Sequence, residues 1–116
     1  MQPEDIADEF AKLRYHVKLL GEAIDRREHS VTAMILDFDW SEEDVERAEN
    51  IFEKYDNLAE SGASIDNFER ELCEAFNINY QQMKQIVLGF YRNGHFIDVC
   101  RAYAKMHPVA EFSEIP

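Results

Sequence analysis

Hydrophobic residues in the first part of the chain repeat at alternating steps of four and three. They are Ile6, Phe10, Leu13, Val17, Leu20 and Ile24. Such steps average about 3.5 residues, which is the repeat of a coiled-coil seam. Pro3 suits the first turn of a helix, because its missing N–H would be unpaired there anyway. The pattern predicts an amphipathic helix from Pro3 to the pair Arg26 and Arg27, whose charges suit the negative end of the helix dipole.

Two interpretations of this seam remain open from the sequence. In the first, the seam pairs with another helix from a second molecule, an arrangement that Glu9 and Arg14 beside it would support and Gly21 would weaken. In the second, the seam faces the core of a small bundle within one chain. The self-association anchors predicted by the first interpretation are Phe10, Leu13, Val17, Leu20 and Ile24.

The stretch DFDWSEEDVE, residues 37–46, has the alternating oxygen side chains of a calcium loop. An EF-hand loop counted from Asp37 needs glycine at its sixth position and glutamate at its twelfth, but Glu42 and Ala48 stand there. The same residues make a helix start, with Ser41 as N-cap and Asp44 three residues later. We therefore expect no metal site here. A short buried helix capped by Ser30 is expected just before it, over residues 31–37.

The helix predicted for residues 42–60 is amphipathic. Its apolar face includes Val45, Ala48, Phe52, Tyr55 and Ala59. Its opposite face carries a row of carboxylates that we call the acidic stripe: Glu42, Glu46, Glu49, Glu53, Asp56 and Glu60. A charged row opposite an apolar face is usually a solvated surface, and the alternative is a docking surface for a basic partner.

Three further helices are predicted in the remainder. The chain breaks at 61–64 and resumes with a helix ending at Phe76, for which Asp66 and Glu69 could form a capping box. Asn79 and Gln82 repeat that start signal for a helix that ends at residues 93–94. The last helix spans about 96–106, with Met106 expected in the core, and residues 111–116 are expected to be a frayed tail.

Composition narrows the class of protein. The 116 residues suit one domain, expected over residues 1–110, and no apolar run is long enough to cross a membrane. The net charge of −12 argues against direct binding to nucleic acid. Residues 37–60 hold ten acidic and two basic residues, a net charge of −8, whereas residues 77–110 hold four basic and one acidic, a net charge of +3. These opposite charges favour self-association slightly, although they could also meet within one chain.

Candidate chemistry is sparse. The four histidines, His16, His29, His95 and His107, are scattered singly and form no metal-binding pair. No nucleotide-binding or nucleophile motif occurs, and the two cysteines lie far apart in apolar patterns. The acidic start lacks the basic flank of a signal peptide. We therefore expect a cytoplasmic protein that is not an enzyme, with no catalytic residue, no cofactor and no metal.

Two resemblances complete the sequence interpretation. Residues 89–108, GFYRNGHFIDVCRAYAKMHP, resemble one tetratricopeptide hairpin, but no 34-residue period follows, so an ordinary helix pair is favoured. The segments 13–25, 34–44 and 90–103 occur in the order seen in the small bacterial family typified by Bacillus YhaI, which the chain resembles. That resemblance implies an all-helical fold and a bacterial cytosolic setting, and it carries over no functional residue.

The sequence thus predicts a single all-α bundle of five to six helices. The expected function is that of a non-enzymatic interaction module that forms a homo-oligomer through its first helix. The alternative is an acidic decoy whose stripe imitates a row of phosphates and occupies a nucleic-acid-binding protein. The two hypotheses differ in which residues carry the function, the seam or the acidic stripe.

Overall fold

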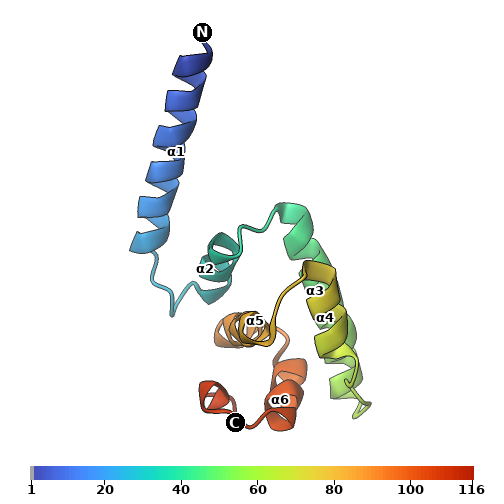
Figure 1. Cartoon of the computed structure of the whole chain (residues 1–116). Coiled ribbons are helices and arrows are strands. Elements are labelled where there is room, and N and C mark those ends of the chain that lie inside the picture. The colour runs from blue at the N-terminus through green and yellow to red at the C-terminus, as the bar shows by residue number, and fades with distance from the viewer. Residues whose placement is uncertain (1) are drawn as a thin grey trace.

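The computed structural model describes residues 2–116 and is all-helical over that range (Figure 1). Its elements, in chain order, are α1 (Pro3–Ala23), α2 (Ser30–Asp37), α3 (Glu42–Glu60), α4 (Phe68–Phe76), α5 (Tyr80–Arg92), α6 (Ile97–Met106) and the 3-10 turn η1 (Ala110–Phe112). The predicted all-α class with six helices is confirmed.

Helices α2 to α6 form one packed body. Within it α3 packs on α4 and α6, while α5 contacts α2, α4 and α6. Phe52 of α3 lies at the centre of this body and is fully buried. Its ring meets those of Phe68 and Phe90 with centroids 5.0 and 4.5 Å apart. Aromatic rings from α3, α4 and α5 therefore interlock at one point and fix these helices against one another.

The helix starts follow two of the predicted capping signals. Ser41 and Asp44 form a reciprocal capping box at α3, and Asn79 does the same with Gln82 at α5. Each box satisfies amide groups that the first helical turn leaves unpaired. Gly94 ends the α5 segment with a φ of 74°, a conformation that favours glycine.

Two other predicted helix caps are wrong, although the helices themselves form. Ser30 is the first residue of α2, and its hydroxyl donates back to the carbonyls of Arg26 and Arg27. Asp66 and Glu69 form no capping box, because α4 begins only at Phe68 and its N-cap side chain makes no capping bond. The first helix also ends at Ala23, earlier than predicted, because the backbone turns extended at Ile24.

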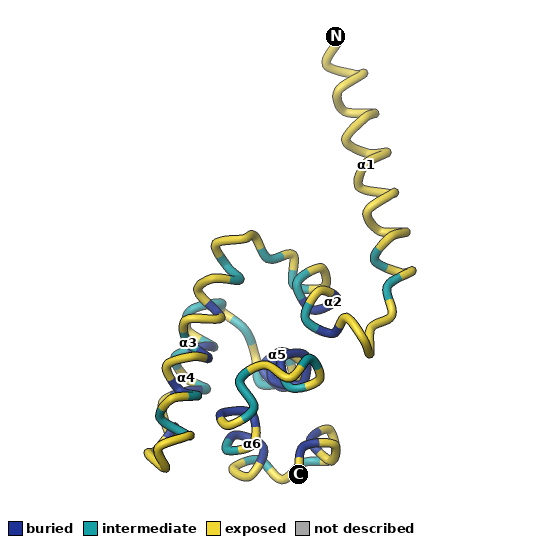
Figure 2. The backbone as a smooth tube through the Cα atoms, turned by 180° about the vertical axis from the view of Figure 1, so that it is seen from behind, coloured by how far each residue is buried: buried dark blue, intermediate teal, exposed yellow. Residues whose placement is uncertain are grey.

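Helix α1 projects from the body as a separate rod (Figure 1). It gives the molecule principal extents of 59 × 25 × 20 Å. No residue of α1 is buried, and almost its whole length is exposed in Figure 2. The interpretation that the seam lies in the core of its own chain is therefore wrong.

The C-terminal tail is docked on the body, so the expectation that it frays is also wrong. Phe112 and Ile115 are buried and belong to the main core cluster. Met106, by contrast, is 47% exposed although the sequence placed it in the core. The core therefore includes residues of the tail, whereas Met106 at the end of α6 lies outside it.

Over the described residues, no helix combines the length and the apolar character needed to cross a membrane. Both cysteines are free thiols, with Cys100 buried in α6. Burial raises the pKa of the Cys100 thiol to about 12, so it remains protonated at neutral pH. Cys100 therefore serves as a small packing residue.

Candidate interaction surface

The seam of α1 forms a continuous apolar surface without a partner in its own chain. The exposed fractions are 63% for Phe10, 56% for Leu13, 52% for Val17 and 68% for Leu20. Ile24 differs from these four, since it lies just beyond the helix and is half-buried. Large apolar side chains lined up in this way are uncommon on the surface of a monomer.

Contact between α1 and the body is confined to the last turns of the helix. A Cβ atom at Gly21 would lie 3.6 Å from Cδ1 of Leu36 in α2, an ordinary van der Waals distance, so α2 passes close to α1 here and would tolerate a small side chain. Arg26, in the connection that follows α1, pairs with Asp37 at 2.8 Å. Upstream of Gly21, Val17 lines a hollow shared with Leu36 and Asp37 of α2 but stays 52% exposed.

Charged residues flank the seam, and none of their pairs anchors α1 to the body. Glu9 makes an exposed pair with Lys12 at 3.8 Å on the same helix. Arg14 forms no ion pair with any residue between 2 and 116. An exposed pair of this kind contributes little to stability, so both Glu9 and Arg14 remain available to a second molecule.

The first four residues of the acidic stripe are exposed along α3. Glu42, Glu46, Glu49 and Glu53 line a shallow hollow of about 310 Å³ beside Phe96. None of the four forms an ion pair within the part of the chain that the structure describes. Glu60 is exposed at the far end of the helix.

Asp56 belongs to the stripe by sequence but has a structural role. Its Oδ1 atom accepts a hydrogen bond from the backbone N–H of Val99 at 3.0 Å. Val99 lies in the first turn of α6, whose own N-cap residue, Phe96, makes no side-chain capping bond. Asp56 therefore caps α6 from the neighbouring helix, which periodicity could not reveal because the partner is 43 residues away.

The titratable side chains of the described residues do not gather into a set of metal ligands. These residues contain no group of three or more His, Cys, Asp or Glu side chains able to hold a metal ion. The histidines stay apart, and His107 lies 3.7 Å from Glu69 as its nearest ionic partner. The perturbed carboxylate that lies between α3 and α4 has a structural role. The pKa of Glu71 is lowered by hydrogen bonds from Lys54 and Tyr55, which tie α3 to α4.

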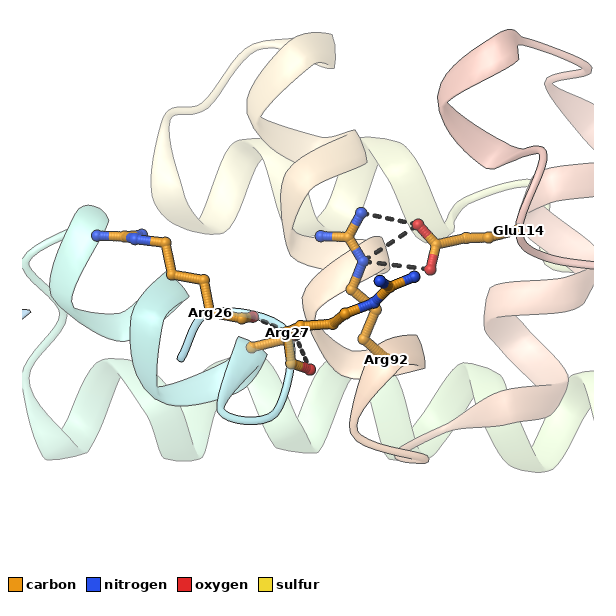
Figure 3. Close-up of polar contacts among 5 residues, drawn as sticks. Arg26, Arg27, Arg92 and Glu114 are labelled. Atoms are coloured by element: carbon orange, nitrogen blue, oxygen red, sulfur yellow. Dashed lines mark hydrogen bonds and ion pairs between the residues drawn. The ribbon is translucent and has the colours of Figure 1, made fainter. Parts of the chain in front are cut away.

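A set of charged contacts at the C-terminal tail was missed by the sequence analysis. Arg92 of α5 makes a bidentate pair with Glu114, with Nη2 to Oε1 at 2.7 Å and Nε to Oε2 at 3.2 Å. Figure 3 shows the guanidinium of Arg27 beside the same carboxylate, with Arg26 directed away from it. The available signal was the alternation of acidic and apolar residues in EFSEI, 111–115, which matches the basic balance of 77–110.

Comparisons with protein-family models, curated proteins and solved structures find no match to this chain. The resemblance to the YhaI family stays a prediction. Function is therefore inferred from the exposed surfaces of α1 and α3.

Proposed function

We propose that this protein is a non-enzymatic, cytoplasmic interaction module that self-associates through α1. The observation that carries the proposal is the exposure of Phe10, Leu13, Val17 and Leu20 on one side of a helix that leaves the body. Helices in proteins draw most of their stability from packing of their apolar face. A second copy of α1 would supply that packing.

The heptad positions favour a parallel, in-register pair of helices. Phe10, Val17 and Ile24 occupy one seam position, and Ile6, Leu13 and Leu20 the other. In a parallel pair each residue would meet its own counterpart, so the five apolar layers from Ile6 to Leu20 would be used, while Ile24 lies beyond the end of α1. The flanking position of Glu9 would then face that of Arg14 in the second copy, the geometry of an interhelical ion pair.

Burial of the seam leucines in such a pair would change the Kd of self-association by a measurable amount. Full burial of a leucine contributes about 1.5–3 kcal/mol relative to full exposure. Leu13 and Leu20 are 56% and 68% exposed, so the two residues together would contribute about 2–4 kcal/mol per copy if buried. Two copies would gain about 4–7 kcal/mol from these leucines, roughly three to five orders of magnitude in Kd.

The test compares the wild type with the Leu13→Ala/Leu20→Ala variant by light scattering after size exclusion. We expect the wild type to elute as a defined multiple and the variant as a folded monomer. The matched control is Tyr15→Ala/Leu19→Ala, which removes two exposed apolar side chains outside the heptad seam. A variant that stays folded and keeps the wild-type mass would refute the proposal.

A second candidate is the acidic decoy. The observation in its favour is that Glu42, Glu46, Glu49 and Glu53 are exposed and lack partners among residues 2–116. Changing these four residues to Gln should abolish capture of a nucleic-acid-binding protein from the host and leave the seam-driven mass unchanged. Recovery of such a partner that is lost on raising salt would favour this candidate.

A further inference from the structure

The tail of the chain is held on the body by side chains alone. The backbone N–H groups of Phe112, Ser113 and Ile115 donate to carbonyls of residues 109, 110 and 112, inside the tail itself. No hydrogen bond joins the backbone of residues 110–116 to the body within the described chain. Release of the tail would therefore leave no backbone hydrogen bond between tail and body to be replaced.

Four side chains make the attachment, two apolar and two acidic. Phe112 and Ile115 are 3% and 7% exposed, and the Phe112 ring meets Tyr103 of α6 edge to face at 5.8 Å. Glu111 accepts from Nζ of Lys84 at 2.9 Å, and Glu114 from Arg92. The contacts therefore follow the pattern acid, apolar, any residue, acid, apolar over residues 111–115.

The receiving surface carries more positive charge than the tail neutralises. Lys84 is buried to 4% exposure, with Nζ 4.9 Å from the centre of the Tyr80 ring. A buried lysine is costly unless an anion faces it, so this position is built for a carboxylate. Hydrogen bonds from Arg92 lower the pKa of Glu114, and the charge of Arg27 lowers it further. Three cations thus surround two carboxylates.

We propose that the surface formed by α5, α6 and Arg27 is a peptide-docking groove for acidic segments of the pattern Glu-apolar-x-Glu-apolar. In the free chain the tail, residues 111–115, occupies this groove and competes with a partner that carries a similar segment. Charge and shape decide the occupant. Lys84 and Arg92 at fixed spacing select the two acidic positions, and burial against the core selects apolar residues at the positions of Phe112 and Ile115. The groove is independent of the proposed self-association through α1.

The test uses a fluorescent peptide, PVAEFSEIP, that copies residues 108–116, and fluorescence anisotropy with the full-length chain. The tethered tail competes at an effective concentration of about millimolar, so the wild type should bind the peptide weakly. The Glu111→Gln/Glu114→Gln chain, whose tail is weakened while the groove is intact, should bind it at least about tenfold more tightly. The matched control, Glu42→Gln/Glu46→Gln, removes two exposed carboxylates elsewhere and should bind like the wild type.

Two further variants report on specificity. Adding Lys84→Gln and Arg92→Gln to the weakened-tail chain should abolish the gain, and a peptide with Ala in place of Phe112 and Ile115 should bind neither chain. Equal affinity of the two peptides for the weakened-tail chain would overturn the proposal. The same titration in the Leu13→Ala/Leu20→Ala background should give the same result, which separates this groove from the seam.

Hydrogen exchange of the wild type tests the proposal without any substitution. A competing tail must open locally, so the amides of Phe112, Ser113 and Ile115 should exchange faster than those in the centre of α5. Exchange of tail and α5 amides at one common rate would show that the tail leaves only when the body unfolds. That result would also overturn the proposal.

Discussion

The same substitution at two phenylalanines should have opposite consequences. Phe52 is fully buried among Phe68, Phe90 and Phe96, whereas Phe10 is 63% exposed on α1. Truncating a buried phenylalanine costs about 3–5 kcal/mol, so Phe52→Ala should lower the free energy of unfolding by that amount at every protein concentration. Only about a third of the Phe10 surface is buried within its own chain. Phe10→Ala should therefore lower the free energy of unfolding of the monomer by less than about 1 kcal/mol.

The cost of Phe10→Ala should appear in association. Burial of the exposed part of Phe10 would contribute about 1–2 kcal/mol per copy, or roughly 30- to 1000-fold in the Kd of a pair. Urea unfolding at several protein concentrations separates the two effects. The wild-type midpoint should rise with concentration, because association stabilises the folded state by mass action. Phe10→Ala should weaken that rise, and Phe52→Ala should lower all midpoints.

Two outcomes would refute this reasoning. If Phe10→Ala lowered the stability of dilute protein as much as Phe52→Ala, α1 would pack on its own body in solution. If the wild-type midpoint did not depend on concentration, the seam would not drive self-association. Circular dichroism at 222 nm is a suitable signal, since both the body and α1 are helical.

Three other predictions follow from single contacts. Asp56→Ala should destabilise the body by about 1 kcal/mol through loss of the α6 cap, while the exposed Glu53→Ala should change stability little; thermal unfolding compares the two. The lowered pKa of Glu71 means that its contribution to stability is present above its ordinary pKa of 4.5 and lost as the pH falls through the lower folded value. Glu71→Gln should flatten the acid side of a stability–pH curve. A Leu13→Cys variant should form an intermolecular disulfide under mild oxidation if the helices pair in parallel, with the wild type, which has only Cys73 and Cys100, as control.

The alkaline side of the same curve offers a check on Tyr55. Its pKa is raised to about 12 by burial and by the hydrogen bond to Glu71. Because the pKa of Tyr55 is higher in the folded state, the stabilisation by its protonated hydroxyl is fully present below pH 10. It is lost as the pH rises toward 12. Tyr55→Phe should remove that part of the alkaline loss, and a wild-type-like alkaline limb in the variant would contradict the assignment.

Local signals in the sequence predicted much of the fold. The capping residues Ser41 and Asn79 act on amides within their own first turn, so their effect can be read without knowledge of the tertiary structure. The same holds for Gly94, whose left-handed backbone is a local requirement. The predicted cap at Ser30 was wrong because a serine hydroxyl at a helix start can also donate to a carbonyl of the preceding loop. The path of that loop decided that Ser30 bonds the carbonyl of Arg26.

What the sequence determined by itself was the amphipathic character of α1 and α3, because periodicity is a property of neighbouring residues. It could not decide whether the seam of α1 faces the core of its own chain or lies outside that core, since a core and a partner helix select the same apolar residues. The tertiary structure decided this point. The aromatic cluster around Phe52 closes the body without α1 and leaves the seam exposed. Long-range contacts likewise moved Asp56 from a surface row to a helix cap and brought Glu114 to Arg92, 22 residues away.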